Sequence, residues 1–182
     1  MMHWAVWIWA LVYAGFTLLI LSGLRSINRG GSSASPTVSV VVAARNEAAN
    51  IGRCIASLRA QDYNGGGFFE VIVADDRSAD GTGAILRDLA DSMSNLHVIH
   101  IDRTPAGISP KKHALTLAIA SANGDIILQT DADCVVPPGW ISGMVRAFEP
   151  GVGFVAGIAP YRKAPGLLNS FVRHEYLWNS AL

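Results

Sequence analysis

Cysteine is scarce in this sequence, which contains only Cys54 and Cys134 among its 182 residues. Neither has a neighbouring ligand at metal-binding spacing, which excludes a cysteine-based metal site. Cys54 falls on the apolar face of an expected helix, so we expect it in the core. Both are predicted to be reduced thiols in a cytosolic domain.

An excess of positive charge is also absent. The 14 lysines and arginines balance the 14 aspartates and glutamates, giving a formal net charge of zero. No dense basic cluster occurs anywhere along the chain. Because binding to a phosphate backbone requires a basic face, we expect no nucleic-acid partner.

Two familiar phosphate-binding motifs are missing. The first expected strand continues into A-R-N-E-A-A-N-I-G rather than G-x-G-x-x-G, and no G-x-x-x-x-G-K-[ST] occurs. Dinucleotide-binding and P-loop functions therefore lose their main support.

Charged residues are absent from Trp4 to Leu24. At about 1.5 Å per residue a helix here would extend roughly 30 Å, the thickness of a bilayer's hydrocarbon core. Residues 1–24 are therefore predicted to form a transmembrane anchor. No lysine or arginine precedes this segment whereas Arg25 and Arg29 follow it, which favours an anchor over a cleaved signal peptide. We expect a single-pass protein of the cell (inner) membrane whose remaining residues are cytoplasmic.

Residues 25–36 are rich in glycine and serine and are predicted to be a linker to a domain at 37–182. In that domain short Val/Ile-rich runs alternate with helical periodicity. Strands are expected at 38–44, 69–74, 96–101 and 125–130, and helices near 51–58, 83–93 and 111–122. Continuous apolar strands indicate burial on both faces, so the fold class is α/β with a mostly parallel sheet and helices on both faces. Ligands should collect at the strands' carboxyl ends.

Asp131 and Asp133 follow the apolar run Asp125–Thr130. Residues two apart in a strand point the same way, so both carboxylates can face one spot beyond the sheet. Two hard oxygen ligands suit Mg²⁺ or Mn²⁺, which keep other positions for water and phosphate. The alternative interpretation is that these carboxylates cap a following helix.

Asp75 and Asp76 form a second acidic pair, at the end of the second expected strand. Adjacent carboxylates repel each other, and a ligand with donor groups, such as a base N–H or a ribose hydroxyl, is a reason to hold both. Ser78 and Asp80 in the loop that follows are better interpreted as helix caps.

Lys111 opens a helix after a loop containing Pro105, Gly107 and Pro110. A lysine in the first turn opposes the helix dipole unless an anion binds there, so Lys111 is a candidate pyrophosphate or sugar contact. A solvated surface lysine is the alternative, and it is the favoured interpretation for Lys112.

Four segments occur in a characteristic order: V-V-V-A-A-R-N-E, V-A-D-D-R-S-A-D-G-T, P-K-K-H-A-L and I-L-Q-T-D-A-D-C. Over residues 37–148 this set resembles membrane-associated glycosyltransferase family 2, which has the Rossmann-like GT-A fold. The resemblance implies inverting transfer of a sugar from a nucleoside-diphosphate sugar, with Mg²⁺ or Mn²⁺, to a membrane lipid or glycan acceptor.

The resemblance also implies roles for individual residues. Arg45, Asn46 and Glu47 would border the nucleotide pocket, and Asp75 or Asp76 would contact the base. Lys111 would lie near the pyrophosphate, Asp131 would contact the ribose or sugar, and Asp133, with Asp131, would hold the metal. The donor-binding set is thus Ala44, Arg45, Asn46, Glu47, Asp75, Asp76, Lys111 and Asp131. Ala44 departs from the family's frequent proline.

The general base is the main departure. Family members carry an acidic motif well beyond the Asp-x-Asp, and many carry Gln-x-x-Arg-Trp, but nothing after Asp133 matches either. Glu149 and Glu175 are the later carboxylates, and neither lies in an acidic motif. We therefore expect the base beyond Leu182, in a longer enzyme of which this chain is the donor-binding part. Leu167–Leu182 is predicted to be an amphipathic or membrane-surface helix.

Two alternatives belong to other functional classes. Residues 131–135 fit the D-x-D-x-[TV] pattern of haloacid-dehalogenase-like phosphatases. That pattern should open its domain, and too few residues follow it here. The second alternative is a non-catalytic, membrane-tethered module that binds nucleotide sugars.

Overall fold

The computed structural model describes residues 2–25, 36–63 and 68–157. These fall into two compact units, one comprising 31–151 and the other the remaining N- and C-terminal residues. Most of the linker predicted at 25–36 lies outside the described residues. The helix predicted at Leu167–Leu182 lies wholly outside them.

A long helix, α1 (Met2–Arg25), forms where the uncharged segment predicted one. Among the described residues, however, no helix qualifies by length and apolarity as one that crosses a membrane. The transmembrane anchor predicted at residues 1–24 is therefore not confirmed.

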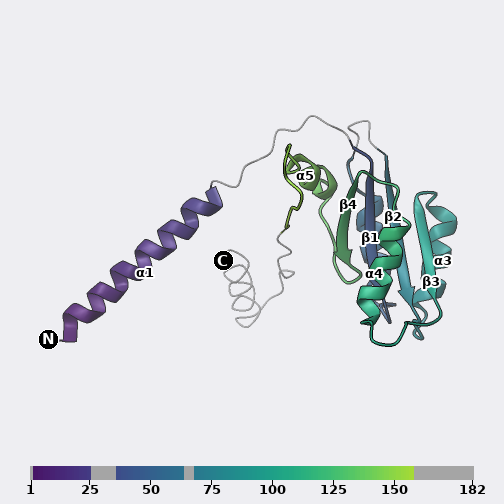
Figure 1. The fold of residues 1–182 in the computed structure, drawn as a ribbon, viewed down its shortest axis with the longest axis horizontal. Coiled ribbons are helices and arrows are strands. Elements are labelled where there is room, and N and C mark those ends of the chain that lie inside the picture. Colours follow the sequence, from purple (N-terminus) through teal and green to yellow (C-terminus); the bar gives the residue numbers. More distant parts are fainter. Residues whose placement is uncertain (1, 26–35, 64–67, 158–182) are drawn as a thin grey trace. The chain divides into compact units, whose positions relative to one another are not determined.

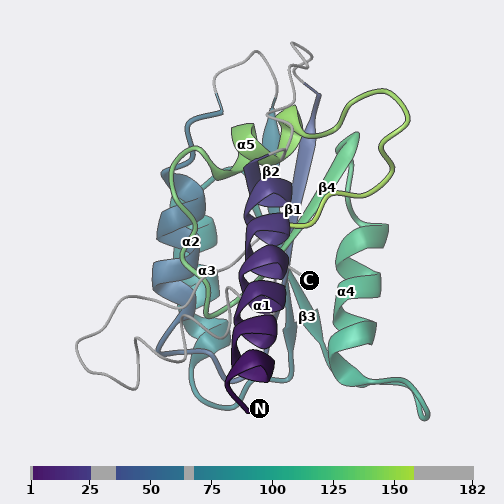
Figure 2. The same cartoon turned by 90° about the vertical axis from the view of Figure 1, so that its left-hand side faces the viewer.

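The unit at 31–151 alternates strands with helices along the chain (Figure 1). The elements are β1 (Val38–Ala44), α2 (Ile51–Arg59), β2 (Phe69–Asp76), α3 (Thr82–Ser92), β3 (Leu96–Ile101), α4 (Pro110–Ala120), β4 (Ile126–Asp131) and α5 (Trp140–Arg146). The strands form a four-stranded sheet in the order β3-β2-β1-β4, and every pair is parallel. Helix α4 lies on one side of the sheet, and α2 and α3 lie on the other (Figure 2). The predicted parallel α/β, Rossmann-like architecture is confirmed.

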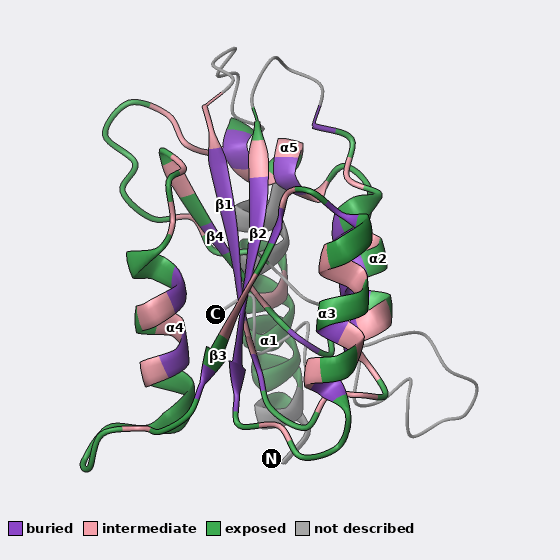
Figure 3. Cartoon of the chain, turned by 90° about the vertical axis from the view of Figure 1, so that its right-hand side faces the viewer, coloured by how far each residue is buried: buried purple, intermediate pink, exposed green. Residues whose placement is uncertain are grey.

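Alternating side chains of the central strands build two apolar layers. Val40 and Val42 of β1 pack with the buried residues of α2, such as Ile55, whereas Val41 packs with Ala114 of α4. Figure 3 shows β1 and β2 as the strands with the most continuous burial. Strands β3 and β4 are only partly buried, contrary to the expectation for all four, because they are the outer strands of the described sheet.

The buried carboxylate of Glu70, near the start of β2, contacts both the start of β1 and the segment before β4. Glu70 accepts hydrogen bonds from the Ser39 hydroxyl at 2.7 Å and from the Asn123 backbone N–H at 2.8 Å. Burial alone would raise the pKa of Glu70, but these hydrogen bonds hold it below its usual value. Gly124 N–H donates to the Ser39 hydroxyl at 2.8 Å, so this network fixes where β4 starts beside β1.

Strand and helix ends differ slightly from the prediction, and one difference affects the acidic pair. Strand β2 continues two residues beyond Ala74 and includes both Asp75 and Asp76. Successive strand residues point to opposite faces of a sheet. The two carboxylates therefore cannot serve one ligand as an adjacent pair.

A candidate donor-binding cavity

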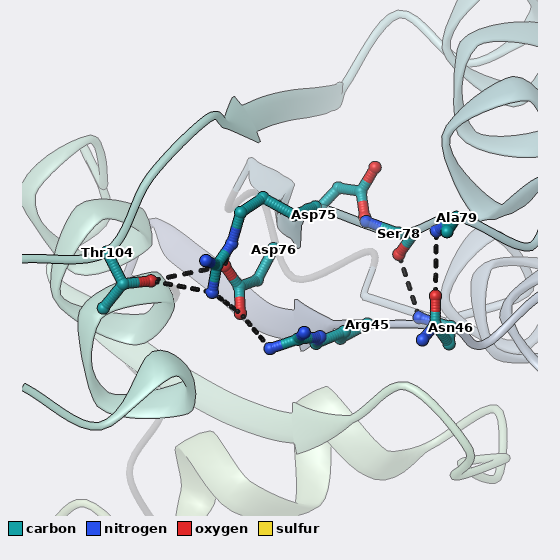
Figure 4. A network of polar contacts seen from close by, with 8 residues as sticks. Arg45, Asn46, Asp75, Asp76, Ser78, Ala79 and Thr104 are labelled. Atoms are coloured by element: carbon teal, nitrogen blue, oxygen red, sulfur yellow. Dashed lines mark hydrogen bonds and ion pairs between the residues drawn. The ribbon is translucent and has the colours of Figure 1, made fainter.

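The loops after β1 and β2 are tied together by side chains. Asn46, in the left-handed region with φ 55°, donates its N–H to the Ser78 hydroxyl and accepts at Oδ1 from the Ala79 N–H, both at 2.9 Å (Figure 4). The N–H of the next residue, Glu47, donates to the Thr82 hydroxyl at 2.8 Å. These bonds give the loop after β1 a defined shape.

Asp80 fulfils part of the predicted capping role, whereas the Ser78 hydroxyl accepts from the loop after β1 instead. Gly81 is the N-cap of α3, and no side-chain capping bond is formed there. Asp80 accepts from the Ala48 N–H at 3.0 Å as well as from the N–H of Thr82, the first residue of α3. The long-range contacts explain the difference, because each side chain also satisfies a backbone donor of the neighbouring loop.

Asp76 is the centre of an ionic network. Arg77 donates to both carboxylate oxygens, at 2.9 and 3.3 Å, and Arg45 approaches to 3.4 Å. The Asp76 side chain is only 4% exposed. Hydrogen bonding from Arg77 is the main cause that holds the pKa of Asp76 below its usual value. Figure 4 shows Arg45 beside the Asp76 carboxylate. This carboxylate stays ionised and orients the guanidinium groups of both Arg45 and Arg77.

Asp75 faces the other side of the sheet. Its carboxylate accepts from the Ser78 N–H at 3.3 Å and lies 3.5 Å from Nδ1 of His100. Together with Arg87 and His100 it lines a hollow of about 500 Å³ next to the start of α3. The sequence left open which aspartate contacts a base, and the structure separates the two by face.

A second cavity, of about 420 Å³, brings most of the predicted site residues together. The carboxyl ends of β1, β2 and β4 and the first turn of α4 enclose it. Its lining includes Ala44, Arg45, Glu47, Asp76, Lys111, Asp131 and Asp133. Asn46 and Asp75 do not line it. Glu149 does not line it either, and Glu175 lies outside the described residues.

Two residues of this cavity could supply oxygen ligands for a cation. Asp131 ends β4 and Asp133 follows it, and both side chains are exposed to the cavity. In the described part of the chain, no group of three or more histidine, cysteine, aspartate or glutamate residues could hold a metal. Two carboxylates still fit Mg²⁺ or Mn²⁺, which commonly take one or two protein carboxylates and complete their shell with water and substrate phosphate.

Cys54 lies beside this site but is unsuited to bind a metal. Cys54 is buried in the core as predicted, and its thiol lies 3.6 Å from the Asp131 carbonyl oxygen. Burial is the main cause that raises the pKa of Cys54 to about 12, so it stays a neutral thiol. Both cysteines are free, which confirms the prediction of reduced thiols.

Arg77 and Thr104 do not line the second cavity, but both contact Asp76, which does, and neither was predicted. Arg77 follows the acidic pair directly and has a positive φ of 55°, whereas Thr104 donates to Asp76 at 3.5 Å from the loop after β3. The sequence position of Arg77 was a usable signal, since it adjoins two carboxylates. Thr104 had none.

The family model described as Glycosyl transferase family 2 matches residues 39–181. The chain belongs to glycosyl transferase family 2. This confirms the family predicted from the ordered motifs and removes the phosphatase alternative.

Curated relatives of this family member are longer. The β-monoglucosyldiacylglycerol synthase of Synechocystis sp. is 35% identical over 81% of this chain, and glycosyltransferase AglE of Haloferax volcanii is 31% identical over 69%. The matched parts are 33% and 40% of those two proteins, respectively. The chain thus spans well under half the length of these relatives.

Solved structures support the same fold. The mannosyltransferase PcManGT from Pyrobaculum calidifontis, solved in complex with GDP-Man and Mn²⁺, is similar with a TM-score of 0.61 and 27% identity. The similarity covers 82% of this chain and 44% of that one. A GT-A-type fold is therefore shown for the unit at 31–151, called the transferase unit below.

Proposed function

We propose that this chain forms the donor site of an inverting glycosyltransferase that uses a nucleoside-diphosphate sugar and Mg²⁺ or Mn²⁺. The carrying observation is the cavity of about 420 Å³ that collects two cationic and several acidic groups at the sheet's carboxyl edge. Ligands of parallel α/β sheets bind at this edge. The Mn²⁺ and GDP-Man named for the similar mannosyltransferase support both the donor class and the metal.

The cationic groups suit the diphosphate. Lys111 lies in the first turn of α4, where backbone N–H groups and the helix dipole also favour an anion. Arg45 lines the same cavity and is half exposed, with Asp76 orienting its guanidinium. The cavity lining, which includes Asp76 and not Asp75, supports Asp76 as the residue that would accept from a base or ribose. Asn46 supports the pocket indirectly by shaping the loop.

Asp133 and Asp131 would hold the metal. A divalent cation there supplies stabilisation of the negative charge that develops on the departing nucleoside diphosphate. Asp131 would also accept from a hydroxyl of the ribose or sugar. The acceptor hydroxyl also needs a general base on the opposite side of the anomeric carbon.

The acceptor is proposed to be a membrane lipid or a glycan. The name of the Synechocystis relative, a β-monoglucosyldiacylglycerol synthase, supports a lipid.

Donor binding tests the function directly. Isothermal titration of the 182-residue chain in mild detergent should show UDP or GDP binding with Mn²⁺ and at least a tenfold loss of affinity with a chelator, because the cation bridges carboxylates and phosphates. Binding that is equally tight with the chelator would contradict the metal role. A different outcome would favour the non-catalytic module. In that case nucleotide binding would depend on the metal, but a protein extended downstream would release no nucleoside diphosphate from any sugar donor.

Membrane attachment is a separate part of the proposal. We infer that residues 1–24 anchor the protein in the cell membrane with the transferase unit in the cytoplasm, supported by the uncharged segment Trp4–Leu24 and the arginines after it. A reporter fused after Pro36 should be active in the cytoplasm, and the protein should resist carbonate extraction. A matched fusion with Arg25 and Arg29 replaced by glutamine should lose part of this orientation bias. Activity of the first reporter only outside the membrane would contradict the topology.

A further inference from the structure

Lys111 already makes a cation contact with a proposed metal ligand. Its Nζ, in the first turn of α4, lies 2.8 Å from Oδ1 of Asp131, the last residue of β4. The two side chains are 59% and 52% exposed, so the pair is accessible from the cavity rather than locked in the core. Within the described residues, Lys111 is the cationic side chain paired with Asp131.

This ammonium group and a divalent cation would compete for the same carboxylate. A hard cation needs the oxygens of Asp131, and the charge of Lys111 would repel it at close range. A lysine is a compact charge on a long side chain with several rotatable bonds, so it can exchange one anion for another nearby. A diphosphate bound at the first turn of α4 would offer that second anion in the same cavity.

We propose that Lys111 occupies the cation position on Asp131 while the donor is absent and moves to the diphosphate when the donor binds. This rests on the function proposed above. The exchange makes the diphosphate and the divalent cation enter the cavity cooperatively, because each removes an obstacle to the other. It also keeps Asp131 neutralised between catalytic cycles.

The proposal predicts opposite effects in one variant. Lys111→Met should bind Mn²⁺ alone about three- to tenfold more tightly than wild type, since an exposed ion pair and a nearby like charge are lost. The same variant should bind Mn²⁺ more weakly than wild type when UDP or GDP is present. The factor by which the nucleotide tightens Mn²⁺ binding should therefore fall at least tenfold. A residue that only contacts the diphosphate would not change binding of Mn²⁺ alone.

The experiment uses the 182-residue chain and follows free Mn²⁺ by electron paramagnetic resonance, with and without saturating UDP or GDP. Lys112→Met is the matched control, because Lys112 is the next residue of α4 and does not line the cavity. It should change each affinity less than twofold. Circular dichroism checks that all three proteins are folded.

The outcomes separate this inference from the proposed function. Unchanged or weaker binding of Mn²⁺ alone by Lys111→Met would overturn the exchange, as would equal tightening by Lys112→Met, which would reflect overall charge. In either case, intact coupling between Mn²⁺ and nucleotide in wild type would leave the function standing. If wild type shows no such coupling, the proposed function itself fails.

Discussion

Asp133→Asn is expected to weaken Mn²⁺-dependent binding of a nucleoside diphosphate about 100-fold, because even loss of a group that only supports a metal ligand typically costs about 10–100-fold. The amide removes a negative charge and leaves Asp131 as the remaining carboxylate of the pair. Asp133 is exposed and lies beyond the end of β4, so the fold should be unaffected. Titration calorimetry with UDP and GDP, at several Mn²⁺ concentrations, measures the loss.

Asp91→Asn provides the control for Asp133→Asn, since Asp91 is an exposed aspartate near the end of α3 and does not line the cavity. It should bind nucleotide and Mn²⁺ as wild type does. If Asp133→Asn kept the wild-type dependence on Mn²⁺, the metal would have to be held by other carboxylates of the cavity, with Glu47 the next candidate.

The gathering of site residues at one sheet edge was predictable from the sequence. Apolar runs predicted the parallel strands, and parallel strands bring their carboxyl ends together. Pairing of Ala43 with Asp131 and of Ala44 with Asp75 places these three strand ends side by side. The roles assigned to individual residues there stay predictions.

The separate environments of Asp75 and Asp76 could have been predicted but were not. Strand alternation puts neighbours on opposite faces, and the error was to end the strand at Ala74, before the acidic pair. Polar residues at a strand end look like a loop in sequence, although the sheet pairing extends through Asp76.

The ties between the two loops were beyond sequence reasoning. Asn46 contacts Ser78 and Ala79, more than 30 positions away, and the same side chains are equally suited to local capping. Only the closeness of β1 and β2 decides between a local and a distant partner. The family resemblance identified Arg45, Asn46 and Glu47 as a group but gave no information on the hydrogen bonds that fix their loop.

Among the glycines that the structure describes, Gly124 is the position where a single methyl group is expected to destabilise the protein most. A Cβ on Gly124 would lie 2.7 Å from the carbonyl carbon of Val38 and closer still to the backbone nitrogen of Ser39. Both obstacles are backbone of the central strand β1, which cannot rotate away as a side chain can. Gly124→Ala should therefore lower the free energy of unfolding by roughly 3 kcal/mol or more, a large part of the 5–15 kcal/mol typical of a domain.

Gly143→Ala is the matched control, because Gly143 lies inside α5 and a Cβ there would meet nothing within 4 Å. Replacing a helical glycine by alanine should raise the free energy of unfolding by about 0.5–1 kcal/mol. Urea unfolding followed by circular dichroism measures both variants. Equal stability of the two variants would show that the start of β4 can move away from β1 without cost.

The same glycine links stability to the donor site. Strand β4 runs from this close approach to Asp131, and its register against β1 sets how far the carboxylates proposed to hold the metal project beyond the sheet. At about 3.3 Å per residue, a slip of one residue would displace Asp131 by that distance and turn it to the other face. At low temperature some of the Gly124→Ala protein should remain native. This folded fraction should bind Mn²⁺ and nucleotide more weakly than wild type. Unchanged binding in the folded fraction would show that the clash is absorbed at the start of β4 and does not reach the Asp-x-Asp end.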